Sequence, residues 1–179
     1  KSMRVQLLDY QREFYKDAGK MSEEVEHLGY VFTMHGDKAR AANFIEMLKR
    51  HQIEIHATSK DIESQANTYY QFDSYFIPFA QDQYRLIKAA FEHRTTFKDS
   101  IFYDVSAFNL ADAFGADFDL VEKRDKDVIG KKIESLESVN PKVEIPEFSD
   151  YGYLIEWEQY AAPAVLYTIL DKDIRVKVA

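Results

Sequence analysis

Residues 30–58 read YVFTMHGDKARAANFIEMLKRHQIEIHAT, and this stretch decides the fold class. The apolar run 30–34 predicts a buried strand, and residues 35–37 predict a turn with Asp37 as the N-cap of a helix. The apolar stripe of that helix recurs at i, i+3, i+4 and i+7: Ala41, Phe44, Ile45 and Leu48. Residues 53–57 alternate between apolar and polar side chains, which predicts a second strand. Strand, helix and strand in such close succession favour a parallel pair with a right-handed crossover.

Both ends of the chain carry helix and strand patterns of their own. The first helix face is formed by residues spaced four, three and four apart: Met3, Leu7, Tyr10 and Phe14. Near the other end, residues 153–157 indicate a strand, and Pro163 suits the first turn of a helix. Residues 174–178 alternate between β-branched and basic side chains, which predicts a last strand. Two βαβ-like units predict an α/β fold, with a parallel or mixed sheet and helices on its faces.

The middle of the chain is rich in aromatic residues and then becomes charged. Residues 75–79 are an apolar run that Pro78 restricts to an edge strand or a strand end, and residues 83–93 predict a helix. Charge and proline over 122–150 predict a poorly packed segment. The expected organisation is an α/β domain over 1–118, a charged connector over 119–150, and a βαβ unit over 151–179 that packs on the first part or opens a following domain.

The composition limits the partners and the chemistry. The net charge is −8 and the sequence pI is about 5.2, so nucleic acid and anionic membrane surfaces are poor partners. The absence of cysteine excludes disulfides, thiolate metal sites and cysteine nucleophiles. No apolar run in the sequence is long enough to span a bilayer. Residues 1–3 run straight into a helical pattern with no apolar signal core, so we expect an internal piece of a longer protein.

Patterns that suggest catalysis are weak in this chain. His51 and Glu54 have the His-x-x-Glu spacing of several zinc hydrolases, but a third ligand is needed and only His56 and His93 follow. The pair also straddles a predicted helix–strand junction, which favours a polar turn. Ser106 lacks a G-x-S-x-G elbow, and four acidic residues on either side of it have no acid/base spacing: Asp99, Asp104, Asp112 and Asp117. We therefore predict no catalytic, cofactor-binding or metal-binding residue.

The turn at Gly36 contributes to the one candidate ligand site. A helix N-terminus can hold a phosphate, but the carboxylate of Asp37 disfavours one here, and a structural turn is the better interpretation. In open α/β sheets, ligands bind at the carboxyl ends of the strands. A small ligand or a peptide at that place would meet residues of two segments: Met34, His35, Asp37, Trp157 and Tyr160.

Two parts of the chain resemble large zinc carboxypeptidases, of the carboxypeptidase A type, from Bacteroidetes-type bacteria. The first part is YFIPFAQDQYRLIK (75–88) with FEHRTTFKDSIFYDVS (91–106). The second comprises YLIEW (153–157), AAPAVLY (161–167) and IRVKVA (174–179). The similarity is to the region downstream of the peptidase domain, where these proteins border a class I glutamine-amidotransferase-like region.

The resemblance implies a periplasmic or secreted parent protein that hydrolyses C-terminal peptide bonds with zinc. None of the family's zinc ligands, its substrate-binding arginine or its catalytic glutamate can be placed on this sequence. An amidotransferase would also need a nucleophilic cysteine. We therefore expect an accessory, non-catalytic domain that supports or orients the peptidase domain, with zinc only in that domain. The expected partners are neighbouring domains of the parent chain, or a second copy bound through the open edge of strand 174–178.

Overall fold

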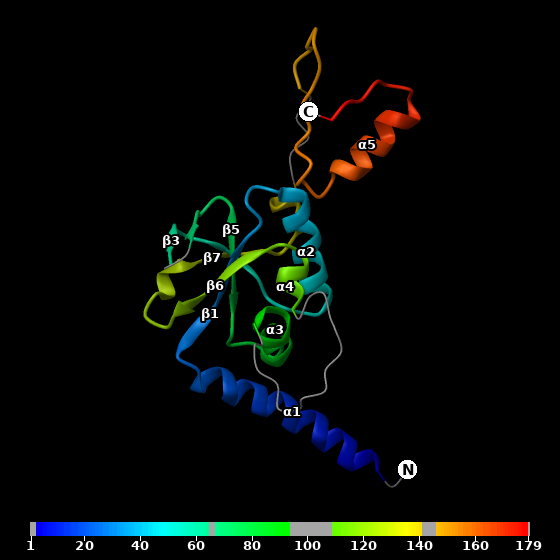
Figure 1. The fold of residues 1–179 in the computed structure, drawn as a ribbon. Helices are drawn as coiled ribbons and strands as arrows, with labels where there is room; N and C mark the ends of the chain where they lie inside the picture. Colours follow the sequence, from blue (N-terminus) through cyan, green and yellow to red (C-terminus); the bar gives the residue numbers. More distant parts are fainter. Residues whose placement is uncertain (1–2, 65–66, 94–108, 141–145, 179) are drawn as a thin grey trace, which may run out of the picture.

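The computed structural model describes residues 3–64, 67–93, 109–140 and 146–178 (Figure 1). Its helices are α1 (Arg4–Glu24), α2 (Lys38–Arg50), α3 (Tyr84–Phe91), α4 (Leu110–Ala113) and α5 (Ala162–Asp171), with short 3₁₀ turns at Lys126–Val128 and Leu136–Ser138. Its strands are β1 (His27–Thr33), β2 (His56–Thr58), β3 (Ile62–Glu63), β4 (Thr68–Tyr69), β5 (Ser74–Pro78), β6 (Asp117–Glu122) and β7 (Ile129–Lys132). We call the part from α1 to residue 140 the body, and residues 146–178 the arm.

Five strands form the main sheet in the order β6-β1-β5-β2-β7, and each neighbouring pair is antiparallel. The chain is therefore a mixed α/β protein, as the sequence predicts, but the expected adjacent parallel pair is wrong. β1 and β2 run in the same direction, because each is antiparallel to β5, yet β5 lies between them. A strand from later in the chain occupies the place that the sequence rule gave to β2.

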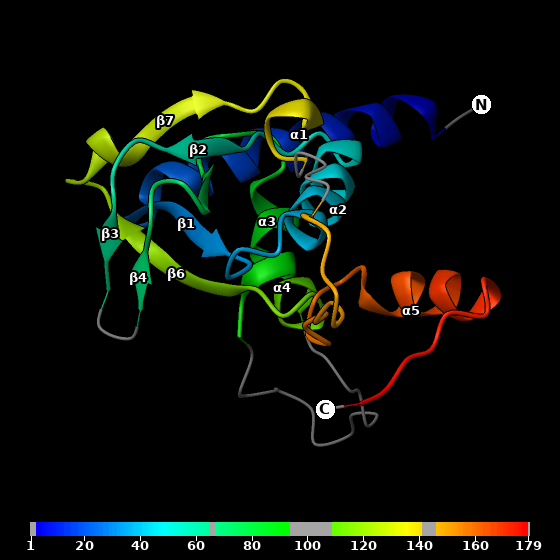
Figure 2. The ribbon, with the colours of Figure 1, turned by 90° about the horizontal axis from the view of Figure 1, so that it is seen from above.

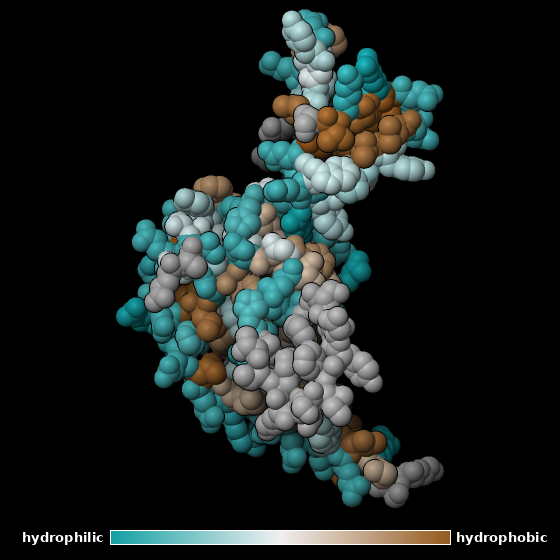
Figure 3. Space-filling model, in the orientation of Figure 1, coloured by the Kyte–Doolittle hydropathy of each residue, from teal (hydrophilic) through white to brown (hydrophobic). Residues whose placement is uncertain are grey.

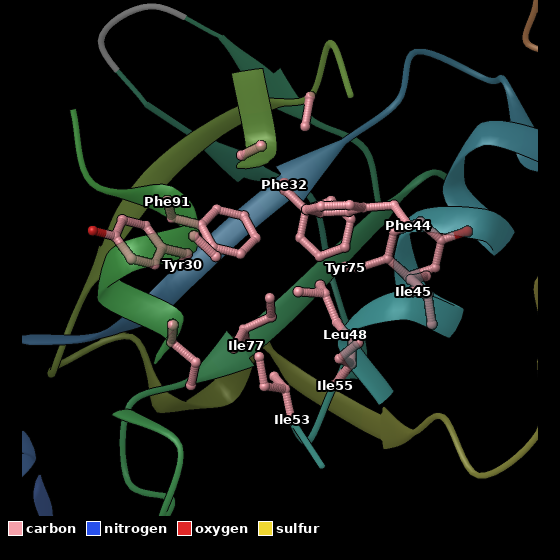
Figure 4. Close-up of a cluster of buried hydrophobic side chains, with 14 of the residues drawn as sticks. Tyr30, Phe32, Phe44, Ile45, Leu48, Ile53, Ile55, Tyr75, Ile77 and Phe91 are labelled. Atoms are coloured by element: carbon pink, nitrogen blue, oxygen red, sulfur yellow. The ribbon is translucent and has the colours of Figure 1, made fainter. Parts of the chain in front are cut away.

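The sheet is covered on both faces, which explains the continuous apolar run at 30–34. Alternate side chains of a strand point to opposite faces. Tyr30 and Phe32 lie in the larger core with the side chains of α2 and α3 (Figure 4). Val31 lies in a smaller core that Ile62 and Tyr69 of the β3–β4 hairpin close. A strand without a polar face is typical of parallel sheets. Because this antiparallel sheet is covered on both faces, β1 has the same continuous apolar run, and the sequence therefore suggested a parallel pair.

Several elements lie where the sequence predicts them. α2 begins after Asp37, whose carboxylate accepts a hydrogen bond from the Arg40 amide at 2.9 Å, and the helix buries its whole predicted stripe. β5 ends at Pro78, which fits the strand-end interpretation, although β5 is the central strand and not an edge. α3 buries Tyr84 and Phe91 in the larger core.

The first part of the expected connector belongs to the sheet. β6 pairs with β1 and β7 pairs with β2, so this stretch supplies both edge strands. Val128, Ile133 and Val139 are each at most 5% exposed. Residues 122–140, the first part of the segment 122–150, are therefore not poorly packed as their charge predicts, because a few β-branched residues reach the core while the charged ones stay in solvent.

Only the second half of α1 packs against the body. Ala18 and Ser22 are buried, and the Arg85 guanidinium of α3 lies over the Phe14 ring, 4.8 Å from its centroid. The predicted apolar face of the first half stays in solvent, and Figures 1 and 2 show the first half of α1 projecting past the body. Among the described helices, none combines the length and the apolar character that crossing a bilayer requires.

The arm projects from the body on the side opposite α1 (Figure 1). α5 forms where the sequence predicts a helix, but residues 153–157 and 174–178 are not strands, so the predicted βαβ unit does not form. Figure 3 shows apolar surface gathered over α5. Leu154 and Val178 are 94% and 101% exposed, so the arm contributes little to the core.

Candidate functional site

The outer edge of β6 is a row of backbone groups with no described strand beside it. β6 is the first strand in the sheet order, and among the described residues it pairs only with β1. An exposed strand edge is a template on which another extended segment can pair. We therefore treat this edge as the candidate functional site.

The hydrogen-bond alternation identifies which groups of β6 face outward. The carbonyl of Leu28 accepts from the Phe79 amide at 2.9 Å, so the even-numbered residues of β1 direct their backbone groups to β5. From Gly29 on, the odd-numbered residues of β1 then bond β6, and the register places them opposite the odd-numbered residues of β6. Phe118 and Leu120 therefore turn their amide and carbonyl groups towards the open edge.

A groove of about 980 Å³ runs along this edge. One wall is the end of α3 with the residues that follow it, and the other wall is the β3 side of the hairpin. The side chains that form the two walls are Lys88, Phe91 and His93 on the α3 side, and Ile62 and Glu63 on the β3 side. A segment that paired with β6 would lie between these walls.

Two apolar side chains of β6 face the α3 side of the groove. Phe118 packs edge-on against Phe91, with ring centroids 5.4 Å apart, and lies against the His93 ring at 4.8 Å. Leu120, on the same face of β6, is 43% exposed. These two side chains offer apolar surface that a bound segment could cover.

The opposite side of β6 is acidic. Asp119 accepts a hydrogen bond from the Tyr69 hydroxyl at 2.9 Å, and Asp117 lies 2.9 Å from Nε2 of His35. Burial raises the pKa of Tyr69, and the hydrogen bond to Asp119 raises it further, so the hydroxyl remains a donor that fixes the carboxylate. The two carboxylates favour cationic side chains on this side of the groove.

The turn after β1 is held by Asp73, which approaches it from the start of β5. The Asp73 carboxylate accepts from the Gly36 amide at 2.6 Å, from the Thr33 hydroxyl at 3.0 Å and from the Lys38 ammonium at 2.9 Å. These bonds hold His35 and Gly36 at φ values of 51° and 83°, in the left-handed region. Because Asp73 already binds the Gly36 amide, the arrangement favours a structural turn over a phosphate site.

The structure brings together only part of the ligand site that the sequence suggests. Asp37 accepts a hydrogen bond from the Tyr160 amide at 2.6 Å, which anchors the arm at the start of α2. Met34 is 2% exposed and belongs to the core, His35 points to β6, and Trp157 is 63% exposed. A hollow of about 440 Å³ lies beside the anchor and is lined by Arg40, Asp112, Ala113, Phe114, Gly115 and Tyr160.

His51 and Glu54 lie in the connection between the end of α2 and the start of β2. The Glu54 carboxylate accepts from Lys132 at 2.6 Å and lies 2.9 Å from Nε2 of His56. The hydrogen bond from Lys132 is the main cause that lowers the pKa of Glu54, and the one with His56 lowers it further. His51 is the C-cap of α2. Glu54 bridges β2 and β7 through its two partners, and within the described ranges no three metal-ligating side chains come together.

The remaining sequence candidates are distributed over separate places. His93 lies 3.0 Å from Asp112, which pairs the end of α3 with α4. Asp99, Asp104 and Ser106 lie outside the described residues. His93 also belongs to the α3 side of the groove along β6, so of these candidates Asp112 is connected to the groove through it.

No protein family, curated protein or solved structure gives a significant match to this chain. The resemblance to zinc carboxypeptidases stays a prediction, and the site rests on geometry. Sequence reasoning missed the edge of β6, because this stretch was assigned to the end of one domain and the start of a connector. The signal that could have found it is the acidic–apolar alternation of DFDLVE, residues 117–122.

Proposed function

We propose that this chain is an accessory, non-catalytic domain that binds an extended segment of a polypeptide along the outer edge of β6. The observation that carries the proposal is the set of outward backbone groups on Phe118 and Leu120, placed in a groove between α3 and the β3–β4 hairpin. Strand addition to an exposed sheet edge is a general mode of peptide recognition, in which backbone bonds give affinity and side-chain pockets give specificity.

The two sides of the groove define the chemistry of the bound segment. Apolar side chains would meet Phe118 and Leu120, and basic side chains would meet Asp117 and Asp119. A segment that alternates apolar and basic residues satisfies both sides at once, because alternate side chains of a strand point to opposite faces. Each backbone hydrogen bond contributes about 0.5–1.5 kcal/mol, and each covered large apolar side chain about 1.5–3 kcal/mol. After ordering of the segment, a dissociation constant on the order of micromolar to millimolar follows.

In a longer parent protein, the bound segment would come from a neighbouring domain. The accessory role in a periplasmic or secreted zinc-carboxypeptidase-like protein, with zinc in its peptidase domain, belongs to this proposal through the sequence resemblance alone. Nothing in the groove requires zinc, because the interactions are backbone hydrogen bonds, apolar contacts and ion pairs.

A second candidate function is a small-ligand module at the carboxyl end of β1. The observation that favours it is the contact of Asp37 with Tyr160, beside the hollow of about 440 Å³. The edge of β6 is the stronger candidate, because its backbone groups, which have no strand partner in the described part of the chain, specify a mode of binding.

The test is a fluorescein-labelled peptide, Val-Lys-Val-Lys-Val, titrated into the full chain and followed by anisotropy. Leu120→Pro removes the outward amide of β6 without removing a bond to β1, so we expect at least a tenfold loss of affinity. Leu120→Val keeps that amide and is the matched control, and circular dichroism checks the fold of both variants. The same test is possible without changing the protein: N-methylation of alternate peptide residues removes backbone donors of the peptide and should also lower its affinity.

Tyr160→Ala separates the two candidate functions in the same titration. Binding along β6 leaves the affinity of this variant unchanged, whereas binding at the hollow lowers it. Equal affinity of Leu120→Pro, Leu120→Val and the original chain for the peptide would contradict the proposed function.

A further inference from the structure

Residues 174–178 have the side chains of a strand but no strand beside them in the described part of the chain. Ile174, Val176 and Val178 are 54%, 40% and 101% exposed. Between them stand two basic residues, Arg175 and Lys177. Three β-branched residues in strict alternation with cations form a segment with high strand propensity, one apolar face and one basic face.

The edge of β6 has the complementary pattern. Phe118 and Leu120 are apolar, Asp117 and Asp119 are acidic, and the outward backbone groups of Phe118 and Leu120 are unpaired in the described residues. The segment 174–178 thus matches the edge in length, in apolar alternation and in charge.

We propose that residues 174–178 of a second copy of this chain add to the outer edge of β6 as an antiparallel sixth strand. The inference rests on the proposed function, and it names the occupant of the groove. In the proposed arrangement the exchange is reciprocal, with each copy giving its strand to the copy from which it receives one, and such an exchange closes into a twofold dimer.

The two alternations fix the register of the added strand. Ile174 opposite Leu120 and Val176 opposite Phe118 put the apolar side chains together on the α3 side. The same register puts Arg175 opposite Asp119 and Lys177 opposite Asp117, on the acidic side. A shift by one residue would place the basic side chains against the apolar wall and the apolar ones against the carboxylates.

The position of the arm favours a second copy over the same chain. The arm is tied to the body by the bond between Asp37 and the Tyr160 amide. From there α5 leads away from the sheet, and Figures 1 and 2 show residues 174–178 held apart from β6. The ten residues of α5 span about 15 Å, so the helix acts as a spacer that presents the segment to a neighbouring molecule.

Sedimentation equilibrium of the full chain over micromolar to millimolar concentrations tests the inference. We expect a monomer–dimer equilibrium that Leu120→Pro and Val176→Pro each weaken at least tenfold, because each removes an amide that the exchanged strand needs. Lys172→Ala, which touches neither the backbone pairing nor the exchanged segment, should dimerise as the original chain does. Leu120→Val keeps the amide and most of the apolar contact, so it should weaken the dimer much less than Leu120→Pro.

Charge exchange tests the register. Asp117→Lys and Lys177→Asp should each weaken the dimer about tenfold, since each places like charges opposite one another in both halves of the dimer. The double variant restores opposite charges and should recover dimerisation. A double variant as weak as the sum of the single ones would overturn this register.

The remaining outcomes separate this inference from the proposed function. Peptide titration into Val176→Pro avoids competition from the chain's own segment. A chain that stays monomeric while this variant binds the alternating peptide overturns the exchange and leaves the proposed function standing. A dimer that Leu120→Pro leaves intact also overturns the exchange, because the copies then meet elsewhere. A monomer that binds no peptide overturns both.

Discussion

The body and the arm contain the same kinds of sequence pattern, yet only the body packs. Residues 53–57 and residues 174–178 both alternate apolar and polar side chains. In the body, Ile53 and Ile55 are at most 3% exposed, and the alternation leads into β2, which has a neighbour on each side. In the arm, the same alternation has no neighbour within the described residues. An alternating segment therefore has the capacity to form a strand, and a paired edge decides whether it does.

Substitutions in the body are expected to lower the free energy of unfolding much more than substitutions in the arm. Phe44, in α2, is fully buried and touches the rings of Phe32, Phe91 and Phe114. Phe44→Ala should lower the free energy of unfolding by about 3–5 kcal/mol, because it removes apolar contacts and leaves a cavity. Tyr167→Ala, on the exposed surface of α5, should change it by less than about 0.5 kcal/mol under dilute conditions. Chemical denaturation of both variants measures the difference, and similar losses would show that the arm shares the core.

A smaller loss of stability is expected from a substitution at Gly29, where two backbones of the sheet approach closely. A Cβ added at Gly29 would collide with the Ile77 carbonyl oxygen of β5 and lie 2.7 Å from the Phe76 ring. Gly29→Ala should therefore destabilise the fold by about 1–3 kcal/mol, since the backbone of the central strand cannot move aside.

Gly19, in α1, is the matched control for that substitution. A Cβ there meets nothing within 4 Å, so Gly19→Ala should stabilise the chain by about 0.5–1 kcal/mol through helix propensity. Thermal unfolding of the pair should shift in opposite directions. A shift in the same direction would mean that α1 or the centre of the sheet is packed differently from this account.

The helices α2 and α3 and the strands β1 and β5 were predictable from local patterns, whereas the edge strands and the assembly of the sheet were not. Asp37 and the stripe from Ala41 to Leu48 specify α2 by capping and periodicity, which are local properties. The place of β5 between β1 and β2 depends on contacts between distant parts of the chain, and no local pattern encodes it. The charged stretch after Glu122 was misjudged because three buried residues, Val128, Ile133 and Val139, outweigh its average composition.

The candidate site was predictable only in part. Sequence reasoning placed Asp37 and Tyr160 at one site, and the structure joins them, but it also placed Met34 there, which lies in the core. The outward direction of the Phe118 and Leu120 backbone groups follows from the register with β1, which single-sequence reasoning cannot supply.

Amide hydrogen exchange in β6 tests the central claim most directly, that the outer edge of this strand binds an extended segment. The measurement uses the Val176→Pro variant at micromolar concentration, with and without the Val-Lys-Val-Lys-Val peptide. The account predicts fast exchange at Phe118 and Leu120 and slow exchange at Asp119 and Val121, because only the latter two donate to β1. Saturating peptide should slow the first pair at least about tenfold and leave the second pair unchanged. Equal protection of all four amides without peptide, or no change at Phe118 and Leu120 on saturation, would contradict it.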